Sequence, residues 1–89
     1  MNFFVYLIIN TKGNRSTSYV GYTKSLKNRL LLHNSSKGAK FTRGRKWTLI
    51  YKRCYKTKSL AMKREYLLKK NTIKRNIIKK KFLDKLNYE

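Results

Sequence analysis

The sequence predicts an α/β (α+β) fold in which a small three-stranded antiparallel sheet is flanked by helices, in the order ββαβαα. Two runs rich in β-branched and aromatic residues lie near the start, a third follows a basic loop, and apolar residues then recur at helical spacing. A chain of 89 residues favours one domain. We expect it to span residues 1–89, with a core at about 3–70 and a basic C-terminal helix at about 72–87.

The first two predicted strands form a hairpin. Residues 3–9 are a continuous β-branched and aromatic run, and residues 10–14 contain the Asn and Gly typical of a turn. Residues 19–23 form the second strand, after a polar stretch at 15–18. Gly21 within this strand indicates a close backbone approach or a bulge.

A short helix and a third strand follow the hairpin. Ser25 is a suitable N-cap for a helix over residues 26–33, and residues 37–46 read as a basic, glycine-containing loop. Residues 47–55 return to strand composition. Strict alternation predicts that one face of this strand carries Trp47, Leu49, Tyr51, Arg53 and Tyr55.

Two helices complete the predicted fold. Ser59 is the expected cap of a helix that runs to about residue 70 and shows one apolar face, and residues 73–86 predict another. The apolar face of the first is expected to contain Leu60, Ala61, Leu67 and Leu68, and that of the second Ile73, Ile77, Ile78, Phe82 and Leu86.

Charge indicates the class of partner. The chain has 24 Lys and Arg residues against 3 Asp and Glu residues, a formal net charge of +21. Basic residues occur in every segment from Lys12 to Lys85, whereas membrane binding favours one basic amphipathic helix. A nucleic acid is therefore the expected partner, although ribosomal proteins, nucleoid proteins and nucleases share this composition.

Residue counts exclude several kinds of site and several classes of protein. Cys54 is the only cysteine and His33 the only histidine, which excludes an internal disulfide and a structural zinc site. No apolar run approaches the ~18–20 residues that span a bilayer, and residues 1–9 lack the features of a signal peptide. We expect a soluble intracellular protein of the cytoplasm, nucleoid or nucleus, without a membrane partner.

Glu65 breaks the basic pattern of the second-last helix. It falls at the border of the predicted apolar face, beside Ala61 and Leu68, where it can face a cleft. One carboxylate suffices for Mg²⁺ when water and substrate phosphate supply the other oxygens. The alternative is a solvated glutamate paired with Lys69 at i+4.

Arg29 and His33 lie four residues apart and project from one side of their helix. The guanidinium fork of an arginine matches a phosphate, but Arg29 can also be one more cation on a basic surface. His33 suits either catalysis or capping of the helix end. Tyr6 and Tyr19 can meet across the hairpin, where a phenol can bond to water or phosphate, although tyrosines are also ordinary packing residues in strands.

In this order, these residues resemble the GIY-YIG nuclease family over about residues 3–70. Phe4-Val5-Tyr6 stands at the first motif and Tyr19-Val20-Gly21 at the second, with twelve residues, 7 to 18, between the tyrosines. Arg29 and His33 match the family's helix, and residues 61–65 match the segment that bears its metal-binding glutamate. The chain is most similar to small stand-alone members, to the N-terminal domain of the UvrC excision-repair nuclease and to Slx-type structure-specific nucleases. Phe4 replaces the first motif's glycine.

The resemblance implies catalytic roles for Tyr6, Tyr19, Arg29, His33 and Glu65, a structural role for Gly21, and Mg²⁺ or Mn²⁺ held by Glu65. Arg29 would clamp the scissile phosphate. The formal base stays open among Tyr6, His33 and Tyr19. We expect five loop residues to bind the nucleic-acid backbone, namely Lys40, Thr42, Arg43, Arg45 and Lys46.

The expected function is a divalent-metal-dependent endonuclease that hydrolyses DNA, with branched, flapped or damaged DNA as substrate and a role in repair or recombination. No base-reading module is apparent, so specificity comes from the basic surface or from a protein partner. The alternatives are a catalytically silent DNA- or RNA-binding module of the same fold, and a basic RNA- or ribosome-associated protein in which Glu65 is incidental.

Overall fold

The computed structural model of the protein describes residues 2–12 and 15–87. Three strands, β1 (Phe3–Lys12), β2 (Arg15–Thr23) and β3 (Thr48–Tyr55), form an antiparallel sheet in the order β2-β1-β3. The helices are α1 (Leu26–Asn34), a 3-10 turn η1 (Lys40–Thr42), α2 (Lys58–Lys70) and α3 (Thr72–Asn87). The predicted fold class and element order are therefore confirmed. No helix within the described ranges is long and apolar enough to cross a membrane.

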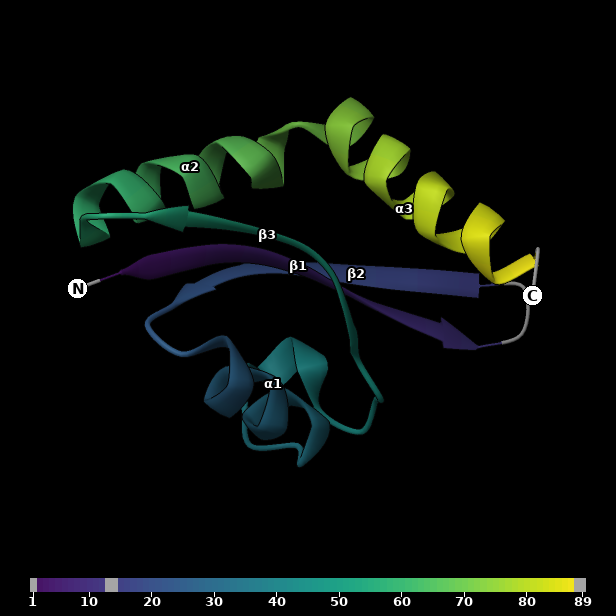
Figure 1. Ribbon diagram of the computed structural model, residues 1–89. Coiled ribbons are helices and arrows are strands. Elements are labelled where there is room, and N and C mark those ends of the chain that lie inside the picture. Colours follow the sequence, from purple (N-terminus) through teal and green to yellow (C-terminus); the bar gives the residue numbers. More distant parts are fainter. Residues whose placement is uncertain (1, 13–14, 88–89) are drawn as a thin grey trace.

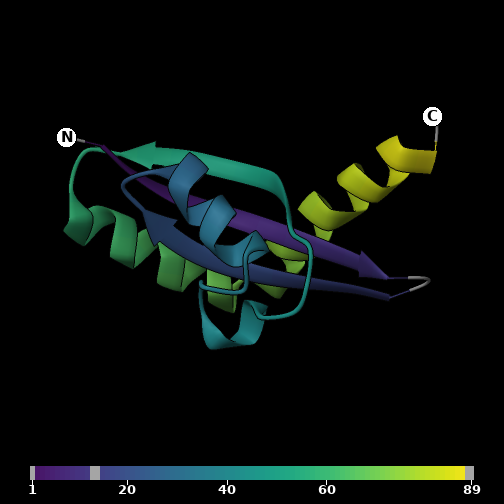
Figure 2. The same ribbon diagram turned by 90° about the horizontal axis from the view of Figure 1, so that it is seen from below.

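The helices lie on both faces of the sheet. In Figure 1, α2 and α3 run above the strands and α1 lies below them. Figure 2 looks onto the lower face, where α1 and the segment around η1 lie against the strands. Because both faces are covered, the central strand β1 buries five consecutive residues, Val5, Tyr6, Leu7, Ile8 and Ile9.

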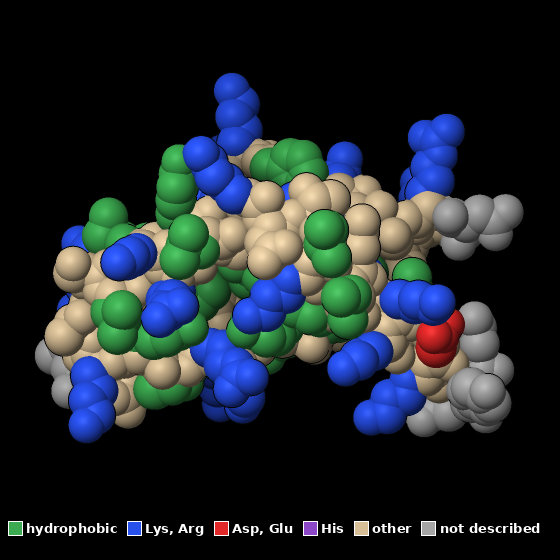
Figure 3. Space-filling model, turned by 90° about the horizontal axis from the view of Figure 1, so that it is seen from above, with side chains coloured by type: hydrophobic (Ala, Val, Ile, Leu, Met, Phe, Trp, Pro, Cys, Tyr) green, Lys and Arg blue, Asp and Glu red, His purple; other side chains and the backbone are tan. Residues whose placement is uncertain are grey.

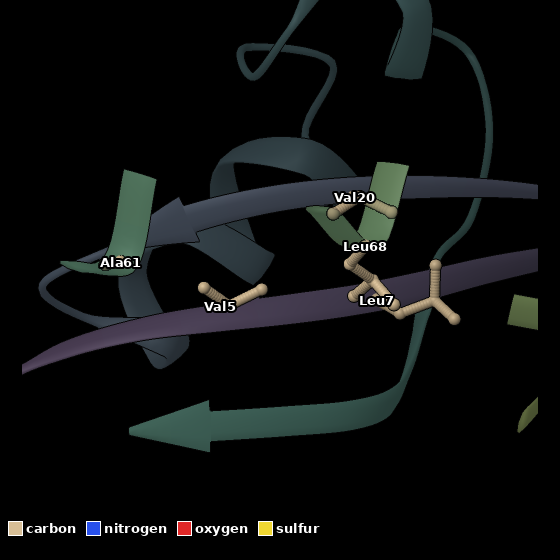
Figure 4. Packing of buried hydrophobic residues seen from close by; sticks show 5 residues of the cluster. All are labelled: Val5, Leu7, Val20, Ala61 and Leu68. Atoms are coloured by element: carbon tan, nitrogen blue, oxygen red, sulfur yellow. The ribbon is translucent and has the colours of Figure 1, made fainter. Parts of the chain in front are cut away.

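Alternate residues of β1 divide between two hydrophobic clusters. Val5 and Leu7 pack with Val20 of β2 and with Ala61 and Leu68 of α2 (Figure 4). On the other face, Tyr6 and Ile8 pack with Trp47, and Leu26 and Leu30 of α1 cover them. The sheet therefore separates an α2 side from an α1 side.

The hairpin strands are longer than predicted. Their ladder runs from Phe4 opposite Thr23 to Lys12 opposite Arg15, so the polar stretch at 15–18 belongs to β2. Backbone pairing with β1 supplies the order that this polar composition does not indicate. Gly13 and Asn14 of the predicted turn lie outside the described residues.

The predicted face of β3 is wrong because the strand contains a register shift. Leu7 lies opposite Tyr51, but the next residue of β1, Ile8, lies opposite Leu49. One extra residue in a strand reverses the alternation beyond it. Trp47 and Leu49 therefore pack on the α1 side, whereas Tyr51 packs on the α2 side.

Ser25 caps α1 as predicted, with its hydroxyl accepting a hydrogen bond from the Asn28 backbone N–H at 3.4 Å. The predicted cap of α2 is wrong. Thr57, rather than Ser59, has extended backbone angles and accepts a hydrogen bond from the Leu60 N–H at 3.1 Å.

The apolar faces of the last two helices are only half buried. On α2, Ala61 and Leu68 are buried while Leu60 and Leu67 are exposed. On α3, Ile78 packs against the α2-side cluster, and the exposed members of the predicted face are Ile73, Ile77 and Leu86.

Candidate active site

A hollow of about 350 Å³ lies beside the edge strand β2. Its lining comes from both sides of the sheet, because Arg29 belongs to α1 and Glu65 to α2. The remaining lining residues are Tyr6, Tyr19, Gly21, Tyr22 and Thr23. Four of the five residues proposed as catalytic from the sequence thus line one hollow. The fifth, His33, does not line it but contacts the Tyr6 hydroxyl.

Gly21 is the reason that Tyr6 reaches this edge. The two residues are paired across the β1–β2 ladder, and a Cβ at position 21 would overlap the Tyr6 hydroxyl and its ring. Tyr6 therefore crosses β2 through the space that a side chain would fill. Gly38 does the same for His33, since a Cβ there would overlap Nδ1 of the imidazole.

Replacing Gly21 with alanine is expected to lower the free energy of unfolding by about 1–3 kcal/mol, because the added methyl group overpacks the Tyr6 ring. Urea unfolding measures this loss. In a Tyr6→Leu background the same replacement should cost less, because the overlapping hydroxyl and ring atoms are gone. An equal loss in both backgrounds would contradict the assigned contact.

His33 is fully buried and links the hollow to the loop after α1. Its Nε2 lies 2.8 Å from the Tyr6 hydroxyl, and its Nδ1 lies 2.9 Å from Oγ1 of Thr42. The Thr42 hydroxyl donates its own proton to the Ala39 carbonyl at 2.7 Å, so it can only accept from Nδ1. A neutral His33 therefore carries its proton on Nδ1 and accepts the Tyr6 O–H at Nε2.

Burial and Arg29 set the protonation of this pair. Burial lowers the pKa of His33 below its usual 6.5, and the Arg29 cation lowers it further. Burial raises the pKa of the Tyr6 phenol above 10.0, while the adjacent Arg29 opposes that shift. At neutral pH the resting pair is a neutral phenol and a neutral imidazole.

The lowered pKa of His33 predicts a pH-dependent stability. Below pH 6.5 the unfolded chain binds a proton that the folded protein resists, so the free energy of unfolding should rise with pH up to about 6.5 and then level off. Because His33 is the only histidine, urea unfolding between about pH 5.5 and 7.5 isolates its contribution. A His33→Gln variant should be flat over this range, and a flat wild-type profile would contradict the prediction.

Arg29 lines the hollow and has an unsatisfied donor. Its Nε is buried and has no hydrogen-bond partner among the described residues. The Tyr6 and Tyr19 phenols raise the pKa of the guanidinium, which is cationic at any relevant pH. A buried N–H of a cation without a partner is costly, and a bound phosphate oxygen would satisfy it.

Glu65 both lines the hollow and forms an ion pair. Its Oε1 lies 3.0 Å from Nζ of Lys69, the i+4 pairing considered from the sequence. The Glu65 side chain is 16% exposed and that of Lys69 is 50% exposed, so Lys69 has room to move away. Within the described ranges, no group of three His, Cys, Asp or Glu residues gathers as a metal site. One carboxylate fits a hard cation that takes its other oxygens from water and phosphate.

The assignment of Thr42 to the nucleic-acid backbone is wrong. Thr42 is fully buried, and its hydroxyl bonds to His33 and Ala39 inside the protein. Its carbonyl also accepts a hydrogen bond from the Trp47 indole N–H at 2.9 Å. The roles of Thr42 and Gly38 depend on contacts with His33 that no pattern within residues 37–46 indicates.

The other loop cations are exposed, namely Lys40, Arg43, Arg45 and Lys46. The last three also line a second hollow of about 560 Å³, together with Lys12 and Arg15 from the end of the hairpin. The Asn34 side chain fixes the end of this loop, because its Oδ1 accepts from the Trp47 backbone N–H at 2.6 Å and its Nδ2 donates to the Trp47 carbonyl at 3.2 Å.

Comparisons with known proteins identify the family of the chain. The model of the GIY-YIG catalytic domain matches residues 2–80. A UPF0213 protein of Staphylococcus epidermidis is 44% identical over 70 residues, covering 78% of this chain and 82% of the relative, and one of Bacillus pumilus is 52% identical over 52 residues, covering 57% and 53%. The solution NMR structure of a UPF0213 protein from Bacillus halodurans is 37% identical, covers 97% of this chain and 85% of that one, and has a TM-score of 0.46. The chain therefore belongs to the GIY-YIG family of nucleases.

Proposed function

We propose that the protein is a divalent-metal-dependent endonuclease that hydrolyses phosphodiester bonds of DNA. One observation carries this proposal: the hollow beside β2 combines a carboxylate, three phenols and an arginine whose buried Nε lacks a partner among the described residues. A scissile phosphate supplies both the anion that Arg29 lacks and the oxygens that a metal on Glu65 needs.

Glu65 is the residue that would hold the metal. GIY-YIG nucleases generally use divalent ions, and Mg²⁺ or Mn²⁺ suits a carboxylate oxygen donor. When bound, the ion supplies stabilisation of charge on the phosphate and on the leaving 3′ oxygen. Lys69 has to share Glu65 or withdraw from it, which its exposed side chain allows.

Tyr6 and His33 would manage the proton of the attacking water. The Tyr6 O–H already points to Nε2 of His33 at 2.8 Å, so Tyr6 can take a proton from water while its own proton passes to His33. The adjacent Arg29 favours the phenolate that forms during this transfer. Tyr19, which also lines the hollow, would limit the positions open to the water.

The basic surface would hold the DNA. Lys and Arg side chains are spread over the face formed by α2 and α3, where acidic groups are scarce (Figure 3). Exposed loop cations and the second hollow extend the positive surface around the α1 side. Such contacts bind the backbone without reading sequence, which supports selection of DNA by shape, as in branched or damaged forms, or through a protein partner.

The test is cleavage of end-labelled duplex, flap, fork, four-way-junction and single-stranded DNA with Mg²⁺ or Mn²⁺, with EDTA as the control. We expect metal-dependent cuts that leave a 5′ phosphate and a 3′ hydroxyl, fastest on branched substrates. Binding without cutting on every substrate would instead support a catalytically silent binding module. In such a module the Glu65 carboxylate only forms the ion pair with Lys69.

A further inference from the structure

An exposed aromatic ring lies next to the candidate active site. Phe41, at the centre of η1, is 52% exposed, and its ring is stacked on that of Tyr19 with centroids 6.2 Å apart and planes at 22°. Tyr19 lines the hollow that contains Arg29 and Glu65. Phe41 is therefore one ring removed from the proposed position of the scissile phosphate.

The ring of Phe41 is packed against two other aromatic rings. The next residue, Thr42, is fully buried and bonds to His33, and the Trp47 indole lies against the same ring with centroids 6.4 Å apart. A ring supported in this way presents a flat apolar face without loss of side-chain freedom on binding.

One cation, that of Arg45, lies over this ring. The Arg45 guanidinium carbon lies 5.2 Å from the Phe41 centroid, and Arg45 also lines the second hollow with Arg43 and Lys46. Phe41 thus contacts one residue of each hollow, Tyr19 of the first and Arg45 of the second. Aromatic rings interleaved with cations bind single-stranded nucleic acids, because bases stack on the rings while cations hold the phosphates. Since Arg45 is exposed, its guanidinium can leave the ring for a phosphate as a base arrives.

We propose that Phe41 is a stacking site for one unpaired nucleobase beside the scissile phosphate. A base within a duplex has both faces covered by its neighbours, so it has no face to offer, whereas an unpaired base gains a stacking partner. This inference rests on the proposed function and deepens it, because it names DNA with an unpaired nucleotide near the cut as the substrate class of the same hollow.

The test measures binding in EDTA, where no cleavage occurs. Two fluorescein-labelled DNA duplexes of equal length, one fully paired and one with a single bulged adenine, are titrated by anisotropy with the full chain. The wild type should bind the bulged duplex about 5- to 150-fold more tightly than the paired one. Phe41→Leu keeps the packing against Tyr19 and Trp47 but removes the flat face, so it should bring the ratio of the two affinities to about 1. Phe41→Trp should retain the preference for bulged DNA.

Tyr66 of α2 is the matched control. It is 54% exposed and carries Lys70 Nζ at 4.6 Å from its centroid, but it does not line the hollow. Tyr66→Leu should leave the ratio unchanged. An absent preference in the wild type, an unchanged ratio in Phe41→Leu, or an equal loss in Tyr66→Leu would each overturn the inference. If the protein does not cleave DNA in Mg²⁺ but the binding preference still depends on Phe41, the proposed nuclease activity is contradicted and the stacking site is not.

Discussion

Replacing Glu65 with glutamine is expected to reduce metal-dependent DNA cleavage by about 10³-fold or more, the equivalent of about 4 kcal/mol in the activation barrier. Glu65 is the only carboxylate that lines the hollow within the described ranges, so its loss leaves no protein ligand for the cation. Single-turnover cleavage of a flap substrate at saturating protein measures the effect.

DNA affinity separates this outcome from misfolding. Glu65→Gln raises the formal net charge from +21 to +22, so binding should be unchanged or slightly tighter. Asp84→Asn on α3 makes the same change in charge away from the hollow and should cleave normally. Equal cleavage by Glu65→Gln and wild type would overturn the assignment of the metal to this residue.

Tyr6→Phe is expected to lower the rate of cleavage by about 10²- to 10⁴-fold, because it removes the hydroxyl that exchanges protons with water and with His33. It also leaves Nε2 of a fully buried His33 without its partner, which should cost about 1–3 kcal/mol of folding free energy. Rates measured well below the melting temperature of the variant separate the two effects.

Tyr55→Phe is the matched control for this experiment. Tyr55 packs on the α2-side cluster, remote from His33, so removal of its hydroxyl should leave the rate near that of wild type. If Tyr6→Phe cleaves at the wild-type rate while it is destabilised as expected, the phenol has a structural role only, and the proton passes elsewhere.

The order and type of the elements followed from local pattern. The continuous β-branched and aromatic run at residues 3–9 predicted the first strand, and the Ser25 cap placed the start of α1. The predicted face of β3 was wrong because the placement of its residues depends on the partner strand β1. The register shift opposite Leu7 and Ile8 reassigned half of β3, and no period in residues 47–55 signals it.

The sequence by itself determined which residue types are available for chemistry: one histidine, three acids and a charge of +21, with Tyr6, Tyr19, Arg29, His33 and Glu65 at family-like positions. Only the tertiary structure decided that Glu65 meets Arg29 at the edge of β2, that Tyr6 passes over Gly21 to His33, and that Thr42 faces inward. The physical reason is the distance along the chain over which each kind of interaction acts. Propensity and periodicity act over a few neighbouring residues, whereas Tyr6 and His33 are 27 positions apart and meet only when both sides of the sheet are packed.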